Sequence, residues 1–251
     1  MLRSDAMPMP IDHLEVTEIL RPTESGMTQP FQCRLEDDQL YAVKGRGALP
    51  KGLLSELYAA QIGVSFGLPI PDVAIALMPT DLLESYSDPS AKDAIGSGPV
   101  FASSWQAPVD NVSVQVLRQI NDYYLSQVYV FDHWIANGDR TLTEDGGNAN
   151  MLVRLRDGSL IVIDHNLAFD VKYSAKELEL HACRSAWIRI KEKAAFKKHL
   201  AKTMVSILAD IKLVNSTMPD EWVESEPEFA DFVKERLEAV HSNVFWDELD
   251  G

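Results

Sequence analysis

The sequence predicts an α+β fold in two parts: a β-rich part with one helix over residues 1–105, and a mostly helical part over residues 106–251. In residues 11–45, short apolar runs with period-two alternation are separated by turn residues, which is typical of strands. From about residue 112, apolar residues recur at helical spacing, with one hairpin among the helices. A chain of 251 residues is long enough for one two-lobed domain with a sizeable core.

Composition narrows the class of protein. Apolar residues make up 46% and charged residues 24% of the chain, as in soluble globular proteins. The net charge of −15 argues against binding to nucleic acid or to an anionic membrane surface. We expect no signal peptide and no membrane span, and hence a cytoplasmic protein. Cys33 and Cys183 are expected to be reduced thiols.

The first strands are expected in DHLEVTEIL, FQCRLE and LYAVKG, which are separated by the turn-rich stretches RPTESGMTQP and EDDQ. In the third strand, alternation places Leu40, Ala42 and Lys44 on one face and Tyr41 and Val43 on the other. Lys44 therefore ends a strand that should be half buried.

A helix is expected over residues 50–66, because Leu53, Leu57, Ala60 and Val64 form an apolar stripe. The motif GLP ends it. The stretches IPDVAIALMP and PVFASSW are strand candidates. The stretch ESYSDPSAKDAIGSG between them is expected to be a mobile polar loop, and QAPVDN after them a connector.

Glu56 lies about 60° from the line through Leu53, at the edge of the apolar stripe. A strand lysine and a helix glutamate twelve residues apart can meet when the helix packs on the sheet. Such a Lys44–Glu56 pair would orient the lysine toward phosphates. The alternative is two solvated surface charges. Upstream, the backbone amides of ESGMTQP could close over a phosphate.

The second part begins with VSVQVLRQINDYYLSQVYVFDHWIAN, a long helix pattern in one piece or two. Helical periodicity returns over residues 174–215 and 228–246, with a break near STMPDEWVESEP. The hairpin MLVRLRDGSLIVID lies between these helices. Its Asp157-Gly158 pair predicts a two-residue type I′ turn.

That turn would pair positions whose numbers sum to 315, so that Asn150 faces His165 and Met151 faces Asp164. Asn150 and Asp164 then lie at one end of the hairpin, provided that the strand twists or ends there. Carboxylate and amide oxygens at a strand end suit Mg²⁺. The alternative is that Asp164 caps the strand and Asn150 is a turn residue, but an unpaired carboxylate after the apolar run LIVI would be costly.

The order of these parts resembles a protein kinase, although the sequence has neither HRD nor DFG. The chain is similar to the HipA-like kinase family in SGMTQPFQC, YAVKG, LLSELYAAQIGVSFGLPIPD, DHWIANGDRT with GNANML, and VIDHN, over roughly residues 12–170. The resemblance implies a protein-kinase-like fold. It also implies that the protein uses ATP and Mg²⁺.

The resemblance also implies roles for the matching residues. Lys44 would hold the α- and β-phosphates and Glu56 would position it. Asp139 would be the catalytic base, and Asn150 and Asp164 would bind Mg²⁺.

Further residues are implied at the nucleotide. Gly26, Met27 and Thr28 would lie over the phosphates. FASSW, with Phe101 and Ser103, would supply backbone contacts to adenine. Arg140 would fix the catalytic loop.

Two departures from the family pattern matter. The kinase signature separates base and metal-binding asparagine by five residues, whereas Asp139 and Asn150 are eleven apart, or nine if Asn148 is the ligand. TLTEDGG therefore reads as an insertion, and a pseudokinase is the alternative. The phosphate loop also begins too early for the extra N-terminal subdomain of the toxin members, so toxin behaviour is not implied.

The leading hypothesis is an ATP- and Mg²⁺-dependent kinase that phosphorylates serine or threonine of a protein. The alternatives are a small-molecule or lipid-headgroup kinase on the same scaffold, or a catalytically dead nucleotide-binding module. A regulatory or antitoxin partner is expected by analogy alone. The Asp132-His133 pair is expected to be structural, and His165 either orients the site or caps its strand.

Overall fold

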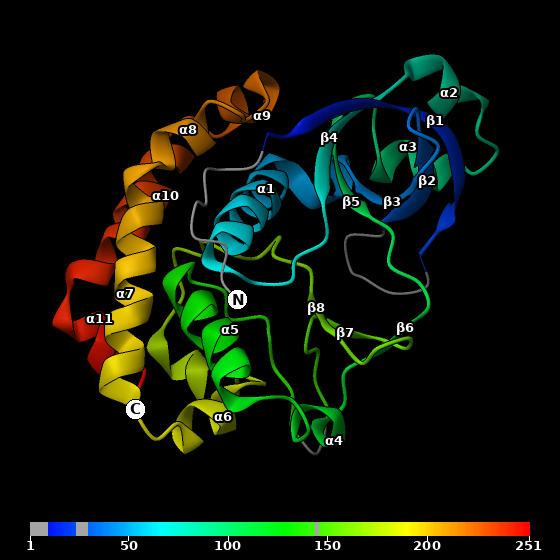
Figure 1. Cartoon of the computed structure of the whole chain (residues 1–251). Coiled ribbons are helices and arrows are strands. Elements are labelled where there is room, and N and C mark those ends of the chain that lie inside the picture. The colour runs from blue at the N-terminus through cyan, green and yellow to red at the C-terminus, as the bar shows by residue number, and fades with distance from the viewer. Residues whose placement is uncertain (1–9, 24–29, 144–145) are drawn as a thin grey trace.

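The computed structural model describes residues 10–23, 30–143 and 146–251. The first part of the chain forms a closed five-stranded barrel with the strand order β1-β2-β3-β5-β4 (Figure 1). β1 pairs with β4 in parallel, and the other neighbouring strands are antiparallel. The strands are β1 (Asp12–Pro22), β2 (Phe31–Leu35), β3 (Leu40–Lys44), β4 (Val73–Met78) and β5 (Gly98–Ser104). The strands expected in this part of the sequence are thus confirmed.

Alternation along β3 decides what this strand presents on each side. Tyr41 and Val43 belong to the apolar cluster of the barrel. Ala42 and Lys44 instead line a cleft on its other side. Because side chains of a strand point alternately to opposite faces, a lysine can end a strand whose other face is buried.

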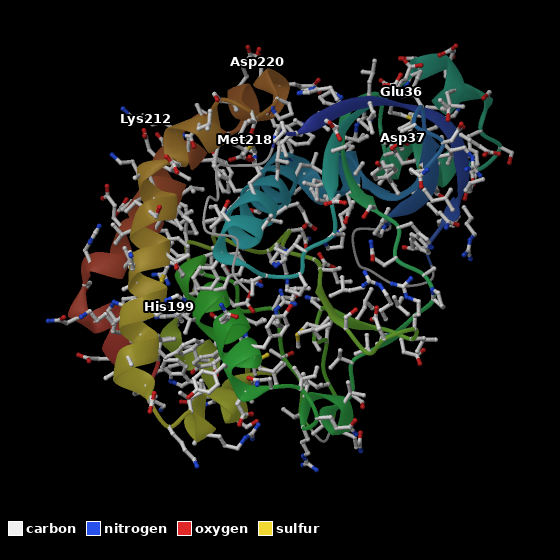
Figure 2. The ribbon with its side chains drawn as sticks, in the orientation of Figure 1. Glu36, Asp37, His199, Lys212, Met218 and Asp220 are labelled. Atoms are coloured by element: carbon white, nitrogen blue, oxygen red, sulfur yellow. The ribbon has the colours of Figure 1, made fainter. Side chains whose placement is uncertain are left out.

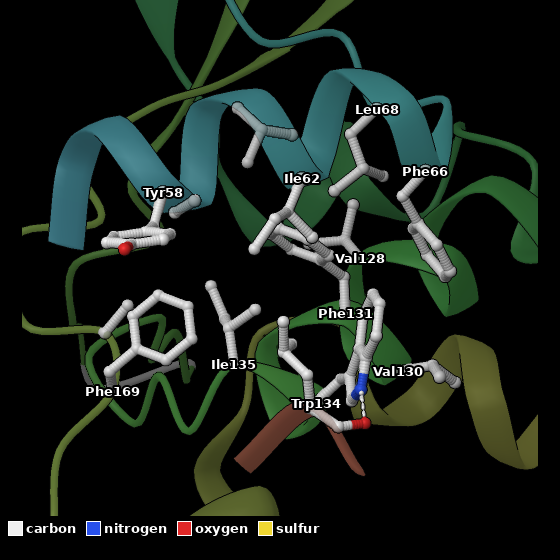
Figure 3. Packing of buried hydrophobic residues seen from close by; sticks show 14 of the residues in the cluster. Tyr58, Ile62, Phe66, Leu68, Val128, Val130, Phe131, Trp134, Ile135 and Phe169 are labelled. Atoms are coloured by element: carbon white, nitrogen blue, oxygen red, sulfur yellow. Dashed lines mark hydrogen bonds between the residues drawn. The ribbon is translucent and has the colours of Figure 1, made fainter. Parts of the chain in front are cut away.

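One long helix, α1 (Leu49–Phe66), follows β3 after the 3₁₀ turn η1 (Arg46–Ala48). Gly67 ends α1 in the left-handed conformation, with φ 92°. Burial extends well beyond the expected stripe, because the helix lies between the barrel and the helical part. Phe66 of α1 packs against Phe131 and Trp134, and these residues are labelled in Figure 3.

The polar stretch after β4 is not a simple loop, and the expectation of one was wrong. The stretch ESYSDPSAKDAIGSG contains the helix α3 (Pro89–Ala94) and the end of the helix α2 (Thr80–Ser85). The side chain of Asp88 accepts a hydrogen bond from the backbone N–H of Ser90, and Pro89 occupies the first turn. This is the chemistry of a helix start. Ala91 and Ile95 are then buried in the barrel cluster, which fixes the segment.

A second, three-stranded sheet has the order β6-β7-β8 and consists of β6 (Val109–Asn111), β7 (Met151–Arg154) and β8 (Leu160–Val162). β6 lies in the stretch expected to be a connector. It pairs with the open edge of the hairpin, whose backbone groups need partners.

The expected hairpin exists, but its predicted register was wrong. Met151 pairs with Val162 rather than with Asp164. The side chain of Asp157 accepts hydrogen bonds from the backbone N–H and the hydroxyl of Ser159, and only Gly158 of the expected pair has a positive φ. The turn is therefore wider than a type I′ turn, which needs positive φ at both central residues. The shift is two residues, so each side chain keeps its face of the hairpin.

The rest of the chain is helical and packs around α5, whose apolar side chains share one core with α1. The expected long helix is in two pieces, and a short helix, α9, lies in the expected break, where Trp222 is buried. The elements are α4 (Val114–Leu117), α5 (Asp122–Trp134), η2 (Ala175–Leu180), α6 (Arg184–Arg189), α7 (Lys193–Ala209), α8 (Ile211–Asn215), α9 (Asp220–Ser225), α10 (Phe229–Glu238), η3 (Ala239–His241) and α11 (Asn243–Glu248).

The structure also bears on membrane spans and on the two cysteines. In the part of the chain that the structure describes, no helix combines the length and apolar character that a membrane crossing requires. Cys33 and Cys183 are buried and free, as expected. Burial raises the pKa of the Cys33 thiol to about 12, so that it stays protonated.

Stability is expected to fall below about pH 6.5 because His133 is buried in its neutral form. Burial lowers the pKa of His133 to about 3, and the charge of Arg236 acts in the same direction. The unfolded chain takes up this proton near its ordinary pKa, whereas the folded chain resists it down to about 3. Acid therefore favours the unfolded state in this window.

Urea unfolding at about pH 7 and about pH 5 measures this loss of stability. The variant His133→Gln should lose part of the difference between the two pH values. His199→Gln is the matched control, because His199 is exposed on α7 (Figure 2). An undiminished difference in His133→Gln would contradict the assignment.

Candidate functional site

A cleft of about 710 Å³ lies between the barrel, α1 and the second sheet. Side chains from distant parts of the sequence line it, among them residues from β3, α1, β5, the polar loop before β7 and the end of β8. Of the residues singled out in the sequence, the cleft contains Lys44, Glu56, Phe101, Ser103, Asn150 and Asp164.

Lys44 makes two ion pairs at the centre of this cleft. Its Nζ lies 2.5 Å from Glu56 Oε1 and 2.7 Å from Asp164 Oδ1. Glu56 is 3% exposed, and its second oxygen accepts a hydrogen bond from the backbone N–H of His165 at 3.0 Å. The helix carboxylate thus holds both the strand lysine and the backbone beside Asp164. The structure brings these groups together, and they are not solvated surface charges.

The pKa values of Lys44, Glu56 and Asp164 depend on one another. Burial alone would lower the pKa of Lys44, but Glu56 and Asp164 outweigh burial and raise it. Burial likewise opposes ionisation of Asp164, yet the nearby lysine holds its pKa below the ordinary value. Burial raises the pKa of Glu56. Lys44 therefore remains a cation in the cleft of a chain whose net charge is −15.

Asp139 and Asn150 meet although eleven positions separate them. Asn150 Nδ2 donates a hydrogen bond to Asp139 Oδ2 at 2.7 Å. Asn150 has φ 46° and Asp164 has φ 59°, so the chain turns sharply just before β7 and soon after β8. The sequence argument needed the strand to end or twist there, and it does. Burial raises the pKa of Asp139, which makes it a better proton acceptor.

The insertion Thr141–Gly147 does not separate these groups. Thr141 N donates to Asn148 O at 2.9 Å, which closes the base of the insertion. Further out, Thr143 and Gly146 pair in the same way. Asn148 is exposed. Asn150, rather than Asn148, is therefore the asparagine that reaches Asp139.

Arg140 ties together the backbone on both sides of the insertion. Its side chain is fully buried, and it donates to the backbone oxygens of Ala149 and Asn150. It also donates to Asp132 Oδ2 at 2.6 Å and to His165 Nε2 at 3.1 Å. This geometry fits the expectation that Arg140 fixes the loop. It also fits a structural role for Asp132 and an orienting role for His165.

A further residue of this network was missed in the sequence. His181 donates from Nε2 to Asp132 Oδ2 at 2.9 Å, because its Nδ1 accepts the backbone N–H of Cys183. Burial opposes the charge on Asp132, but Arg140 and His181 hold its pKa well below the ordinary range. Nothing in the local sequence marks His181, which lies 49 residues beyond Asp132.

The expected nucleotide contacts can be placed only in part. Phe101 and Ser103 line the cleft, and both pair with β3 and β4 in the barrel. Gly26, Met27 and Thr28 lie outside the described residues. The described ends of that loop, Thr23 and Pro30, line the cleft and are joined by a 2.8 Å backbone hydrogen bond.

The oxygen atoms that the cleft offers are too few to hold a metal ion alone. They fit a metal ion that also binds the phosphates of a nucleotide. Among the described residues, no group of three or more His, Cys, Asp or Glu side chains could hold a metal. Asn150 uses its amide nitrogen for Asp139, so its carbonyl oxygen remains for a cation beside Asp164. One carboxylate and one amide oxygen match Mg²⁺, which takes its remaining ligands from phosphates and water.

Comparisons with known proteins show the family and the fold. A family model described as HipA-like kinase matches residues 16–249. A Helicobacter pylori proinflammatory kinase, CtkA, has a similar structure at 12% identity, with a TM-score of 0.60 over 96% of this chain and 98% of that chain. At this identity the likeness concerns the fold. None of the curated proteins searched matches the sequence.

Two crystal structures of the Golgi casein kinase are also similar. One has Mn/ADP bound and gives a TM-score of 0.50 at 12% identity, over 94% of this chain and 73% of that chain. The other gives 0.51 at 11% identity, over 96% and 73%. The α+β architecture of this chain is therefore kinase-like.

Proposed function

The chain belongs to the HipA-like kinase family, and we propose that it transfers the γ-phosphoryl group of ATP, with Mg²⁺, to a serine or threonine hydroxyl of a protein. The observation that carries the proposal is the contact of Lys44 with both Glu56 and Asp164, in a cleft that Asn150, the partner of Asp139, also lines. Phosphoryl transfer depends on positioning and charge neutralisation, and these groups can supply both.

Lys44 would bind the α- and β-phosphates, with Glu56 holding it in place. Asp164 and the carbonyl oxygen of Asn150 would bind Mg²⁺, which neutralises phosphate charge when bound. Because the chain is strongly acidic, the positive charges of Lys44 and Mg²⁺ are needed before a nucleoside triphosphate can bind.

Asp139 would accept the proton of the acceptor hydroxyl. Its Oδ2 is held by Asn150, which leaves the other carboxylate oxygen for the hydroxyl. As the proton moves to Asp139, the hydroxyl oxygen forms a bond to the γ-phosphorus and the bond between that phosphorus and the leaving oxygen of ADP breaks. The raised pKa of Asp139 favours this role.

The adenine would lie at the β5 end of the cleft, beside Phe101 and Ser103. Trp105 N already donates to Leu40 O at 2.8 Å. Backbone contacts to the base would therefore come from the chain just beyond Trp105. As the family resemblance implies, Gly26, Met27 and Thr28 would lie over the phosphates.

We further propose two lobes, residues 1–105 and 106–251, with the nucleotide between them. The acceptor would be a protein in the cytoplasm, and a regulatory partner stays a prediction. A small-molecule kinase would use the same residues. The catalytically dead alternative depended on the insertion, and the hydrogen bond between Asn150 and Asp139 favours an assembled loop.

Mg·ATP is expected to raise the melting temperature of the wild-type chain, because a ligand that binds only the folded state stabilises it by mass action. Lys44→Ala should lose most of this rise. Lys92→Ala, an exposed lysine on α3, is the control and should keep it. A thermal-shift titration measures all three proteins. If wild type shows no shift with Mg·ATP, the kinase proposal fails.

A further inference from the structure

Helix α1 carries Glu56 toward the cleft. Two other buried polar side chains of this helix make hydrogen bonds to the C-terminal helical part. Tyr58 and Gln61 are three positions apart and therefore share one face of α1. Tyr58 Oη donates to Asn215 Oδ1 at 2.9 Å. Gln61 Nε2 donates to Thr217 Oγ1 at 2.8 Å. Tyr58 and Gln61 are 1% and 3% exposed, so water cannot replace these bonds freely.

The partners of these two side chains lie where α8 ends: Asn215 is the last residue of α8, and Thr217 lies in the turn that joins α8 to α9. Thr217 Oγ1 donates to Val214 O at 2.8 Å, which leaves its lone pairs for Gln61. Met218, next in the turn, is buried and lies toward α1 in Figure 2, whereas Lys212 and Asp220 point outward. α9 packs next to α1 (Figure 1). The turn thus caps the face of α1 formed by Tyr58 and Gln61.

Directional bonds are needed here because α1 is buried nearly all round. Apolar packing has little directionality, and a helix surrounded by apolar side chains could rotate without leaving its core. In Figure 3, Tyr58, Ile62 and Phe66 each contact a different part of that core. A rotation of one residue, about 100°, would carry Glu56 away from Lys44.

Ser55 lies three positions before Tyr58 and therefore on the same side of α1. Its hydroxyl is fully buried and donates to Ala168 O at 2.9 Å, in the segment that follows Asp164. The helix is therefore held along one side by the segment that follows Asp164 and by the residues at the end of α8, while Glu56 lies about 100–160° away around the helix axis. Hydrogen bonds from this side to two different segments of the chain fix the rotation of α1 about its axis.

We propose that Tyr58 and Gln61, with Asn215 and Thr217, are positioning residues that set the rotation of α1 and so hold Glu56 and Lys44 in place for the nucleotide. The C-terminal helices then take part in the chemistry of a cleft that they do not line. This inference rests on the proposed function, because it assigns the four residues a role in nucleotide binding through Lys44.

Calorimetric titration of the full chain with Mg·ATP tests the proposal. Tyr58→Phe and Thr217→Val each remove one hydroxyl and keep the shape of the side chain. Each should weaken binding about three- to tenfold, which corresponds to one buried hydrogen bond. Thr217→Ser restores the hydroxyl and should restore the affinity. Tyr173→Phe is the control. It also removes a hydroxyl that is hydrogen-bonded, in this case to His133, and the variant should bind Mg·ATP like wild type.

The same substitutions in a Glu56→Gln background separate positioning from a general structural effect. If the residues act through Glu56, Tyr58→Phe and Thr217→Val should add less than about twofold there, since coupled sites are not additive. An undiminished loss in that background, or wild-type affinity in both single variants, would overturn the inference. Absence of Mg·ATP binding by wild type would instead overturn the proposed function, so the two failures are distinguishable.

Discussion

Asp139→Asn is expected to slow phosphoryl transfer by about 10²- to 10⁴-fold, the range that a general base contributes. The substituted amide keeps the size of the carboxylate and can still accept the hydrogen bond from Asn150 through its carbonyl oxygen. It cannot take up the proton of the acceptor hydroxyl. Because Lys44 and Asp164 are untouched, affinity for Mg·ATP should change little. Transfer therefore fails at the chemical step, after binding.

The measurement follows labelled γ-phosphate into the chain itself and into an added acceptor protein rich in serine and threonine, with Mg·ATP affinity determined in parallel. Asp93→Asn removes an exposed carboxylate from α3 and should leave both quantities unchanged. Transfer by Asp139→Asn at the wild-type rate would show that another group accepts the proton. Loss of nucleotide affinity in step with transfer would mean that Asp139 organises the cleft instead.

Local periodicity was enough to predict that Lys44 and Glu56 can meet, and the structure shows their contact. Lys44 and Glu56 each occupy a position that strand and helix periods constrain, and the short connection between β3 and α1 leaves few ways to pack them. The hairpin pattern predicted that Asn150 and Asp164 lie at one end of the hairpin, although the predicted register was wrong by two residues. They converge because the chain turns at both of them, at the end of the hairpin away from its turn.

Other features depend on contacts that no local pattern records. The register follows from the bonds of Asp157 to Ser159, which widen the turn and outweigh the Asp-Gly signal. Strand β6 forms because the hairpin offers an unpaired edge, and α3 forms because the barrel offers an apolar surface. The bond of His181 to Asp132 joins residues that only the tertiary fold brings together.

The largest loss of stability is expected from Arg140→Met, which keeps an unbranched side chain but removes the charge. Asp132 would then be a buried carboxylate with His181 and Asn137 as its remaining side-chain partners. The backbone oxygens of Ala149 and Asn150 would lose a donor as well. Breaking a buried ion pair on one side costs about 3–5 kcal/mol of unfolding free energy. Urea unfolding monitored by circular dichroism measures it.

Two companion variants test whether the unpaired charge causes this loss. Arg189→Met breaks the exposed pair with Asp122, which makes three hydrogen bonds, and should cost about 1 kcal/mol or less because solvent screens it. Adding Asp132→Asn to Arg140→Met removes the stranded charge and should recover part of the stability. If the double variant is no more stable than Arg140→Met, the lost backbone hydrogen bonds, rather than the carboxylate, account for the cost, and Arg140 is then chiefly a clamp on the loop that carries Asn150.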